Sequence, residues 1–184
     1  MRLLGISGSL RRDSHNTRLL RAAAELAPPG AELELFEGLK GVPPYDEDDD
    51  GDLAPEGARR LREAIARADA VLIATPEYNA SIPGQLKNAL DWASRPIATN
   101  VFRNKPVAVV GSSAGMFGAV WAQAELRKVL GAMGARIADV EVAVGHAGEK
   151  FDADGTLVDD DVREQLADAL SVLGVEVGSG LIAA

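Results

Sequence analysis

Three short segments of the sequence gather glycine, hydroxyl and amide residues next to apolar runs. The first, GSLRRDSHNT (8–17), stands directly before a helical pattern and carries five side chains that can bind a phosphate. These are Ser9, Arg11, Ser14, Asn16 and Thr17. Because a helix start offers unpaired N–H groups and the positive end of the helix dipole, the segment predicts an anion site. Ordinary helix capping by Ser14 or Asn16 is the competing explanation, but it accounts for one side chain and not for the whole loop.

The first segment differs from the common nucleotide-binding loops. It lacks the Gly-Lys-Ser/Thr ending of a Walker A loop, and it does not spell G-x-G-x-x-G. No acid at the end of the second predicted strand is in a convincing place to hold a ribose, as dinucleotide-binding proteins require. One phosphate therefore fits this loop better than a dinucleotide.

The second segment, TPEYNASIPG (75–84), has prolines near both ends and a glycine after the second one. Prolines stiffen a loop, so its backbone N–H and C=O groups stand in fixed places and can bind the edge of a flat heterocycle. Tyr78 offers a ring for stacking. The candidate binding residues here are Pro76, Glu77, Tyr78 and Asn79. The alternative is a rigid turn whose tyrosine only packs.

The third segment, GSSAGMFG (111–118), combines three glycines with two serines between a strand and a helix. Its backbone could approach a ligand closely, and we take Ser112, Ser113 and Gly115 as its candidate residues. A tight turn followed by a helix cap would explain the same composition.

Apolar runs and helical patterns alternate along the whole chain and predict an α/β fold. Strands are expected at 2–7, 31–37, 69–75, 105–113 and 135–144, and helices at 17–27, 55–68, after Pro83, at 119–133 and from Val162 to Leu173. Near-continuous apolar strands indicate a parallel sheet that is covered on both faces. Five strands in one domain, residues 1–184, favour the doubly wound order 2-1-3-4-5. Its switch point lies between strands 1 and 3, so the three segments should meet at one edge of the sheet.

The composition excludes several classes of protein. The chain has 184 residues, no cysteine, two histidines and a formal net charge of −9. Thiolate chemistry and cysteine-bound metals are therefore excluded, and a histidine metal site is not expected. The negative charge argues against nucleic acid and anionic membrane as partners. No apolar run approaches the ~20 residues of a membrane helix, and the N-terminus does not read as a signal peptide, so we expect a cytoplasmic protein.

The segments GSLRRDSHNTRLL, TPEYNASIPGQLKNALDWASR and GSSAGMFG resemble those of the NADPH-dependent FMN reductase family. This flavodoxin-like group includes bacterial chromate and quinone reductases, and the similarity runs from residue 2 to about residue 173. The resemblance implies non-covalent FMN, with its phosphate on the loop of Ser9 and Arg11. It also implies that the loop at Pro76–Asn79 borders the isoalloxazine ring and the ribityl chain, and that Ser112 and Ser113 close the other side.

The resemblance further implies that NAD(P)H donates two electrons, through FMN, to a small acceptor such as a quinone or a metal oxyanion. The flavin then carries the chemistry, and no catalytic acid–base residue is expected. Members of the family are usually homodimers or homotetramers. The choice between NADPH and NADH and the natural acceptor stay open. The alternative is a flavodoxin-like FMN electron carrier without its own NAD(P)H activity.

Two other motifs and two other features carry weaker expectations. FDADGTLVD (151–159) resembles a phosphatase motif but has no buried strand before it, so we expect a polar turn that caps the last helix at Asp159 or Asp160. DEDDDGDLAPE (46–56) resembles a calcium loop but has glycine in the place of its last ligand. Trp92 lies beside the apolar stripe of its helix, which favours a subunit interface. The tail 174–184 has no clear pattern.

Overall fold

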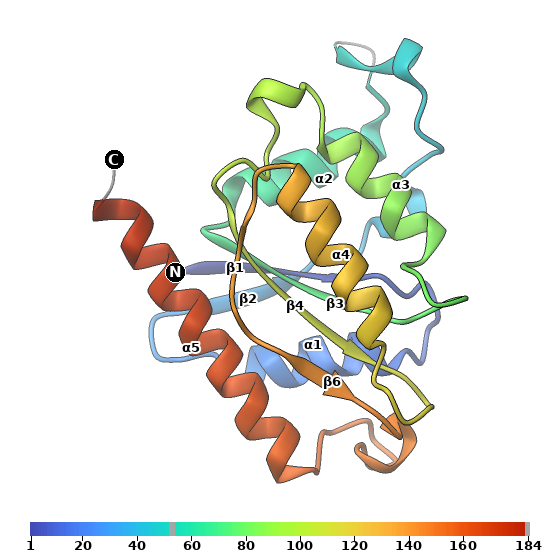
Figure 1. The fold of residues 1–184 in the computed structure, drawn as a ribbon, viewed down its shortest axis with the longest axis vertical. Coiled ribbons are helices and arrows are strands. Elements are labelled where there is room, and N and C mark those ends of the chain that lie inside the picture. Colours follow the sequence, from blue (N-terminus) through green and yellow to red (C-terminus); the bar gives the residue numbers. More distant parts are fainter. Residues whose placement is uncertain (52–53, 183–184) are drawn as a thin grey trace.

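Parallel strands form the centre of the computed structural model, which describes residues 1–51 and 54–182 (Figure 1). The strands are β1 (Arg2–Ser7), β2 (Glu32–Leu35), β3 (Ala70–Thr75), β4 (Pro106–Ser112), β5 (Arg136–Ile137) and β6 (Val142–Val144). They are hydrogen-bonded in the order β2-β1-β3-β4-β5, with β6 also paired to β4. The predicted flavodoxin-like order 2-1-3-4-5 is therefore confirmed.

In the described part of the chain, five α-helices cover the two faces of this sheet (Figure 1). They are α1 (His15–Glu25), α2 (Glu56–Arg67), α3 (Gly84–Ala93), α4 (Val120–Ala132) and α5 (Asp160–Ile182). Short 3-10 turns occupy Leu39–Gly41, Glu47–Asp49, Ile97–Thr99 and Ala147–Glu149. Helices α1 and α5 share one apolar cluster with the sheet, and α2, α3 and α4 share the other.

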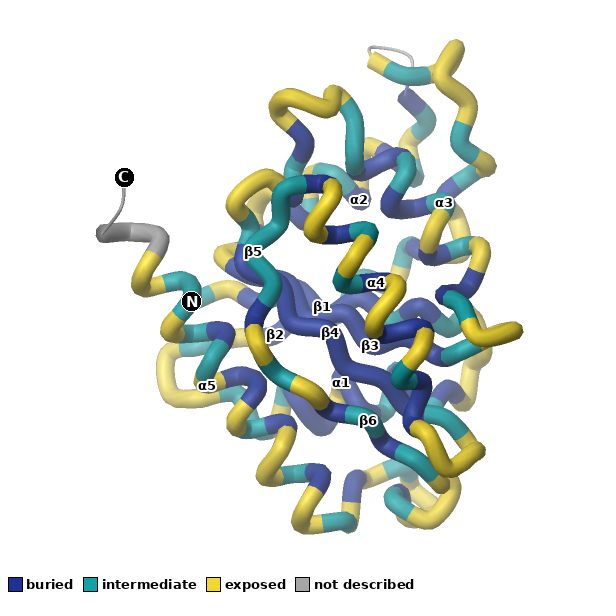
Figure 2. Tube along the Cα trace, in the orientation of Figure 1, coloured by how far each residue is buried: buried dark blue, intermediate teal, exposed yellow. Residues whose placement is uncertain are grey.

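The central strands are buried from end to end, as their apolar sequences predict. Every residue of β3 and β4 is buried, which Figure 2 shows as the dark centre of the molecule. Helix α2 buries Ala58, Leu61 and Ile65, which are spaced three and four residues apart on one face. Because helices cover both faces, these strands show no alternation of polar and apolar residues.

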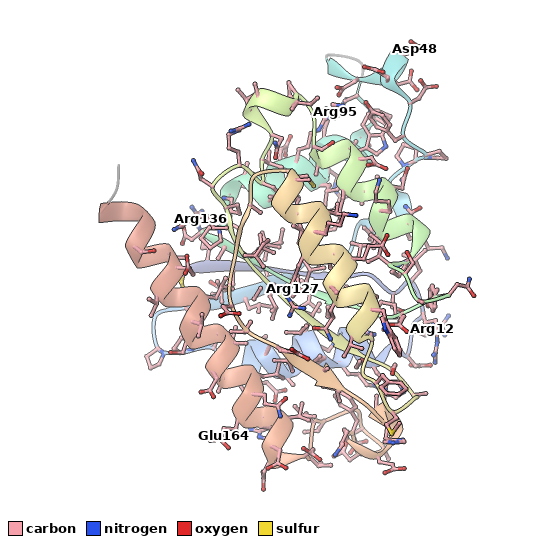
Figure 3. All side chains as sticks on the ribbon, viewed as in Figure 1. Arg12, Asp48, Arg95, Arg127, Arg136 and Glu164 are labelled. Atoms are coloured by element: carbon pink, nitrogen blue, oxygen red, sulfur yellow. The ribbon has the colours of Figure 1, made fainter. Side chains whose placement is uncertain are left out.

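The strand expected at 135–144 is broken into β5 and β6, so its prediction as one continuous element is wrong. Ala138 N–H still donates to Val107 O of β4 at 2.9 Å, but the chain then turns away, and Val140 N–H donates to the carbonyl of Ala138 at 2.9 Å. The Arg127 guanidinium extends from α4 into this break, where it donates to Val140 O at 2.6 Å and Val109 O at 3.1 Å (Figure 3). Burial lowers the pKa of Arg127, and one carbonyl of the broken strand and one of β4 supply the partners that a half-buried cation needs.

The expected position of Trp92 at an interface is also wrong, because its side chain is fully buried within the chain. Its indole N–H donates to the carbonyl of Pro43 at 2.9 Å, and its ring meets Tyr45 edge-on at 5.0 Å. The segment before the acidic loop thus folds over the flank of α3 that the helical pattern left uncovered.

The last helix is longer than expected, because α5 continues through the tail as far as Ile182. Arg136 holds this extension to the sheet by donating to the carbonyl of Glu176 at 2.8 Å. Residues 183–184, the end of the tail, lie outside the described residues. Within residues 1–51 and 54–182, no helix is both long and apolar enough to cross a membrane.

Candidate functional site

The three predicted segments meet at the carboxyl edge of the sheet, where β1, β3 and β4 end side by side. Strand β3 pairs with β1 through Ala74 and Ser7, and with β4 through Thr75 and Gly111. The Gly8 N–H then donates to Ala74 O at 2.8 Å, which continues the pairing into the first loop. The doubly wound order alone therefore brings together residues that lie far apart in the sequence.

The first loop folds back on β1 and leads into α1. Ser14 is the N-cap of α1 and accepts from Thr17 N–H at 3.4 Å, as the sequence suggested. The Thr17 hydroxyl donates to Ser7 Oγ at 2.9 Å, and Ser9 Oγ accepts from Arg11 N–H at 3.4 Å. Ser9 is half-buried and Arg11 is exposed. These two side chains and the start of α1 form a polar surface that suits a phosphate.

Asn16 is buried and its amide joins the first loop to the end of β4. Its Nδ2 donates to Ser112 O at 3.0 Å, and its Oδ1 accepts from Ser112 N–H at 3.0 Å. Asn16 therefore satisfies both backbone groups of one residue in the third loop. Its role as a phosphate donor stays a prediction, because in this structure its amide is engaged with the chain itself.

The second loop is a tight turn that presents its tyrosine to the outside. Tyr78 and Ser81 exchange two backbone hydrogen bonds, and the residues between them, Asn79 and Ala80, have φ of 54° and 59°. Two left-handed residues in this position are the mark of a type I′ turn. The turn leaves the Tyr78 side chain 49% exposed. The Glu77 carboxylate faces α4, where it accepts from two backbone N–H groups.

The third loop contains a buried hydroxyl without a partner. Ser112 is 2% exposed, and its Oγ has no hydrogen-bonding partner among the described residues. His15 Nδ1 is likewise buried and has no hydrogen-bonding partner among the described residues. Burial, together with the charges of Arg18 and Arg11, lowers the pKa of this imidazole. Ser113 Oγ donates to Gly115 O at 3.1 Å. Since buried polar groups normally have partners, the Ser112 hydroxyl fits a site that takes a polar ligand.

Aromatic and apolar side chains lie on or beside the three loops, and of these the sequence predicted only the Tyr78 ring. Exposed large apolar residues on or beside the three loops are Leu10, Tyr78, Met116, Phe117 and Trp121. The rings of Phe117 and Trp121 meet edge-on with their centroids 5.0 Å apart. The available signal was that Met116 and Phe117 stand in a glycine-rich loop and Trp121 stands outside the apolar stripe of its helix.

The segment 151–159 is a polar turn beside the site. Phe151 and Leu157 form an isolated bridge, and Asp152 Oδ1 accepts from the N–H groups of Asp154 and Thr156 at 3.0 and 2.8 Å. Asp159 accepts from Val162 N–H at 3.0 Å, which confirms it as the cap of α5. All these contacts are structural, and none resembles a phosphatase nucleophile on a buried strand.

Replacing Asp152 with alanine should therefore leave oxidoreductase activity within about twofold of the wild type. The change removes two local hydrogen bonds and should cost about 1 kcal/mol of unfolding free energy. Steady-state kinetics and urea unfolding of the purified variant check both numbers. A loss of activity larger than the loss of folded protein would give this aspartate a role in the reaction.

A doubly wound parallel sheet with a polar site at its switch point defines a flavodoxin-like protein. The NADPH-dependent FMN reductase family model matches residues 1–149. An NAD(P)H-dependent FMN reductase of Pseudomonas aeruginosa is 45% identical over 174 residues, which cover 94% of this chain and 93% of that protein. A 2-hydroxy-1,4-benzoquinone reductase of a Burkholderia species is 43% identical over 167 residues, 90% of each chain.

Among solved structures, the flavoenzyme NAD(P)H:(acceptor) oxidoreductase FerB of Paracoccus denitrificans superposes with a TM-score of 0.87. It is 36% identical, and the match covers 97% of each chain. The chain belongs to the NADPH-dependent FMN reductase family. It is an NAD(P)H-dependent oxidoreductase, and the resemblance read from the three loop segments is confirmed.

Proposed function

We propose that the three loops bind FMN without a covalent bond and that the protein transfers two electrons from NAD(P)H to a quinone-type acceptor. The observation that carries this proposal is the convergence of the three loops around the buried Ser112 hydroxyl, which has no hydrogen-bonding partner in the part of the chain that the structure describes. Bound FMN supplies two-electron transfer between a nicotinamide and an acceptor, which no side chain of the protein can perform. The absence of cysteine in the sequence agrees with chemistry that resides in a cofactor.

The residues of each loop take separate parts in the proposed site. Ser9 and Arg11 hold the phosphate together with the N–H groups at the start of α1, where the helix dipole favours an anion. The backbone from Pro76 to Asn79 lies along the edge of the ring system, and the hydroxyl of Ser112 finds its partner on the ligand. Ser113 and Gly115 close the opposite side. Burial lowers the pKa of His15 and so favours its neutral form. The positive charge that attracts the phosphate therefore comes from Arg11.

The identity of the acceptor and the assembly of the protein are further parts of the proposal. Relatives named as quinone reductases support a quinone, and a metal oxyanion is the second class of acceptor. The aromatic rings beside the site suit a planar acceptor better than an ion. The exposed apolar side chains around the loops support a homodimer or homotetramer, and we place the protein in the cytoplasm.

The visible absorption spectrum of the purified protein tests the proposed function. Flavin bands should be present, and anaerobic NADPH or NADH should bleach them within the mixing time of the experiment. A naphthoquinone added afterwards should restore them. Bands that survive both nucleotides would favour the flavodoxin-like electron carrier. A colourless protein that takes up no added FMN would show that the three loops hold another ligand.

A further inference from the structure

Helix α4 begins without a cap from its own sequence. Its N-cap residue, Ala119, is in the left-handed conformation with φ of 64° and provides no side-chain hydrogen bond, and the first turn contains no acidic residue. The second loop provides the missing cap. Glu77 Oε2 accepts from the N–H of Trp121 at 3.1 Å and from the N–H of Ala122 at 3.2 Å. A carboxylate in this place also meets the positive end of the helix dipole.

The residue fixed by this cap carries a large exposed ring beside the site. Trp121 is 49% exposed, and its indole packs edge-on against Phe117, which is 53% exposed. Tyr78, which directly follows Glu77, is also 49% exposed. One carboxylate thus joins the loop that carries Tyr78 to the helix that carries Trp121. Rings held in this way lose little freedom when a flat molecule packs on them, and this favours binding.

We propose that Glu77 is a positioning residue for planar aromatic acceptors. It holds the pair of rings, Trp121 and Phe117, in the place where such an acceptor packs during electron transfer. This inference rests on the proposed quinone reductase function. A carboxylate that only stabilised α4 would affect all acceptors alike, whereas a positioning carboxylate affects the binding of those that need the rings.

Three variants and two acceptors separate these cases. Glu77→Ala removes the cap, and Glu77→Gln keeps an oxygen that can accept both N–H groups. The matched control is Glu125→Ala, because Glu125 is exposed one turn further along α4 and no hydrogen bond of its side chain is found among the described residues. KM and kcat are measured with NADPH for a naphthoquinone and for ferricyanide, which has no flat face to pack on a ring.

Glu77→Ala should raise the KM for the naphthoquinone about fivefold more than the KM for ferricyanide, which corresponds to about 1 kcal/mol of binding free energy. Glu77→Gln should recover most of this difference, and Glu125→Ala should match the wild type. Equal changes for both acceptors, or no change, would overturn the proposal.

Tryptophan quenching by acrylamide provides a readout that needs no activity. In the flavin-free protein, buried Trp92 is shielded, so the accessible fluorescence reports on Trp121. Glu77→Ala should raise the quenching constant, while Glu125→Ala should not. Unchanged quenching would overturn the role of Glu77 even in an active enzyme. A wild-type protein that reduces no naphthoquinone would overturn the proposed quinone reductase function and, with it, the role of Glu77 in acceptor binding. The quenching experiment would still show separately whether Glu77 holds Trp121 in place.

Discussion

Replacing Gly118 with alanine should lower the free energy of unfolding by about 3 kcal/mol or more. Gly118 has φ of +58°, and a Cβ atom built on it would lie 2.3 Å from the carbonyl carbon and 2.6 Å from the oxygen of Ala143. Both are backbone atoms, so no side chain can rotate away, and either the third loop or the β6 region must move. Urea unfolding monitored by circular dichroism measures the loss.

Gly115→Ala is the matched control for stability within the same loop. Its φ lies outside the left-handed range, and the nearest atom to an added Cβ is Ser113 Oγ at 3.9 Å. This variant should change the unfolding free energy by less than about 1 kcal/mol.

Gly118→Ala should also release FMN more readily, since the displaced loop carries Ser112 and Ser113. Equal stability of the two variants would show that the third loop can shift to accommodate a Cβ atom at position 118, which would contradict the prediction.

The central part of the fold was predictable because local patterns determine it. The short apolar runs of β1, β3 and β4 indicate buried strands, and their alternation with helices leaves few arrangements of a parallel sheet. The strand order 2-1-3-4-5 by itself places the three loops at one edge of the sheet. Those predictions depend on burial along each element, which a sequence displays directly.

Features that depend on a distant residue were not predictable in the same way. The apolar spacing of 135–144 does not reveal that Arg127, from another element, occupies the middle of the strand. Nor does the pattern around Trp92 reveal that its indole N–H donates a hydrogen bond to the carbonyl of Pro43. Gly174 and Gly178 reduce helix propensity in α5, and the bonds from Arg136 to the Glu176 region lie outside any local window.

In the site, too, the residue types were predictable from the sequence, whereas their hydrogen-bonding partners were not. The sequence correctly placed polar donors and acceptors at one edge of the sheet. It did not show that Asn16 and Glu77 bind other parts of the chain. Asn16 joins the first loop to the third, and Glu77 joins the second loop to the start of α4. Their contacts make the site rigid before a ligand arrives, which lowers the entropic cost of binding.

Asn16→Ala should both destabilise the protein and weaken FMN binding. The change leaves the N–H and C=O of Ser112 buried without partners, which should cost about 2–4 kcal/mol of unfolding free energy. The loop that carries Ser9 and Arg11 then loses its link to β4. FMN affinity should fall about tenfold or more, corresponding to about 1.4 kcal/mol of binding free energy. Fluorescence titration of the flavin-free protein with FMN measures this fall.

Asn88→Ala is a matched control, because Asn88 makes the same kind of contact away from the site. Its amide accepts from Tyr45 N–H at 2.7 Å and donates to Pro43 O at 2.8 Å. Both variants therefore lose two bonds to backbone, and both should unfold at lower urea concentrations than the wild type. Only Asn16→Ala should lose FMN affinity, because only its partners belong to the site. If the two variants bound FMN equally well, Asn16 would serve the fold alone, neither as a phosphate donor nor as a link between the loops.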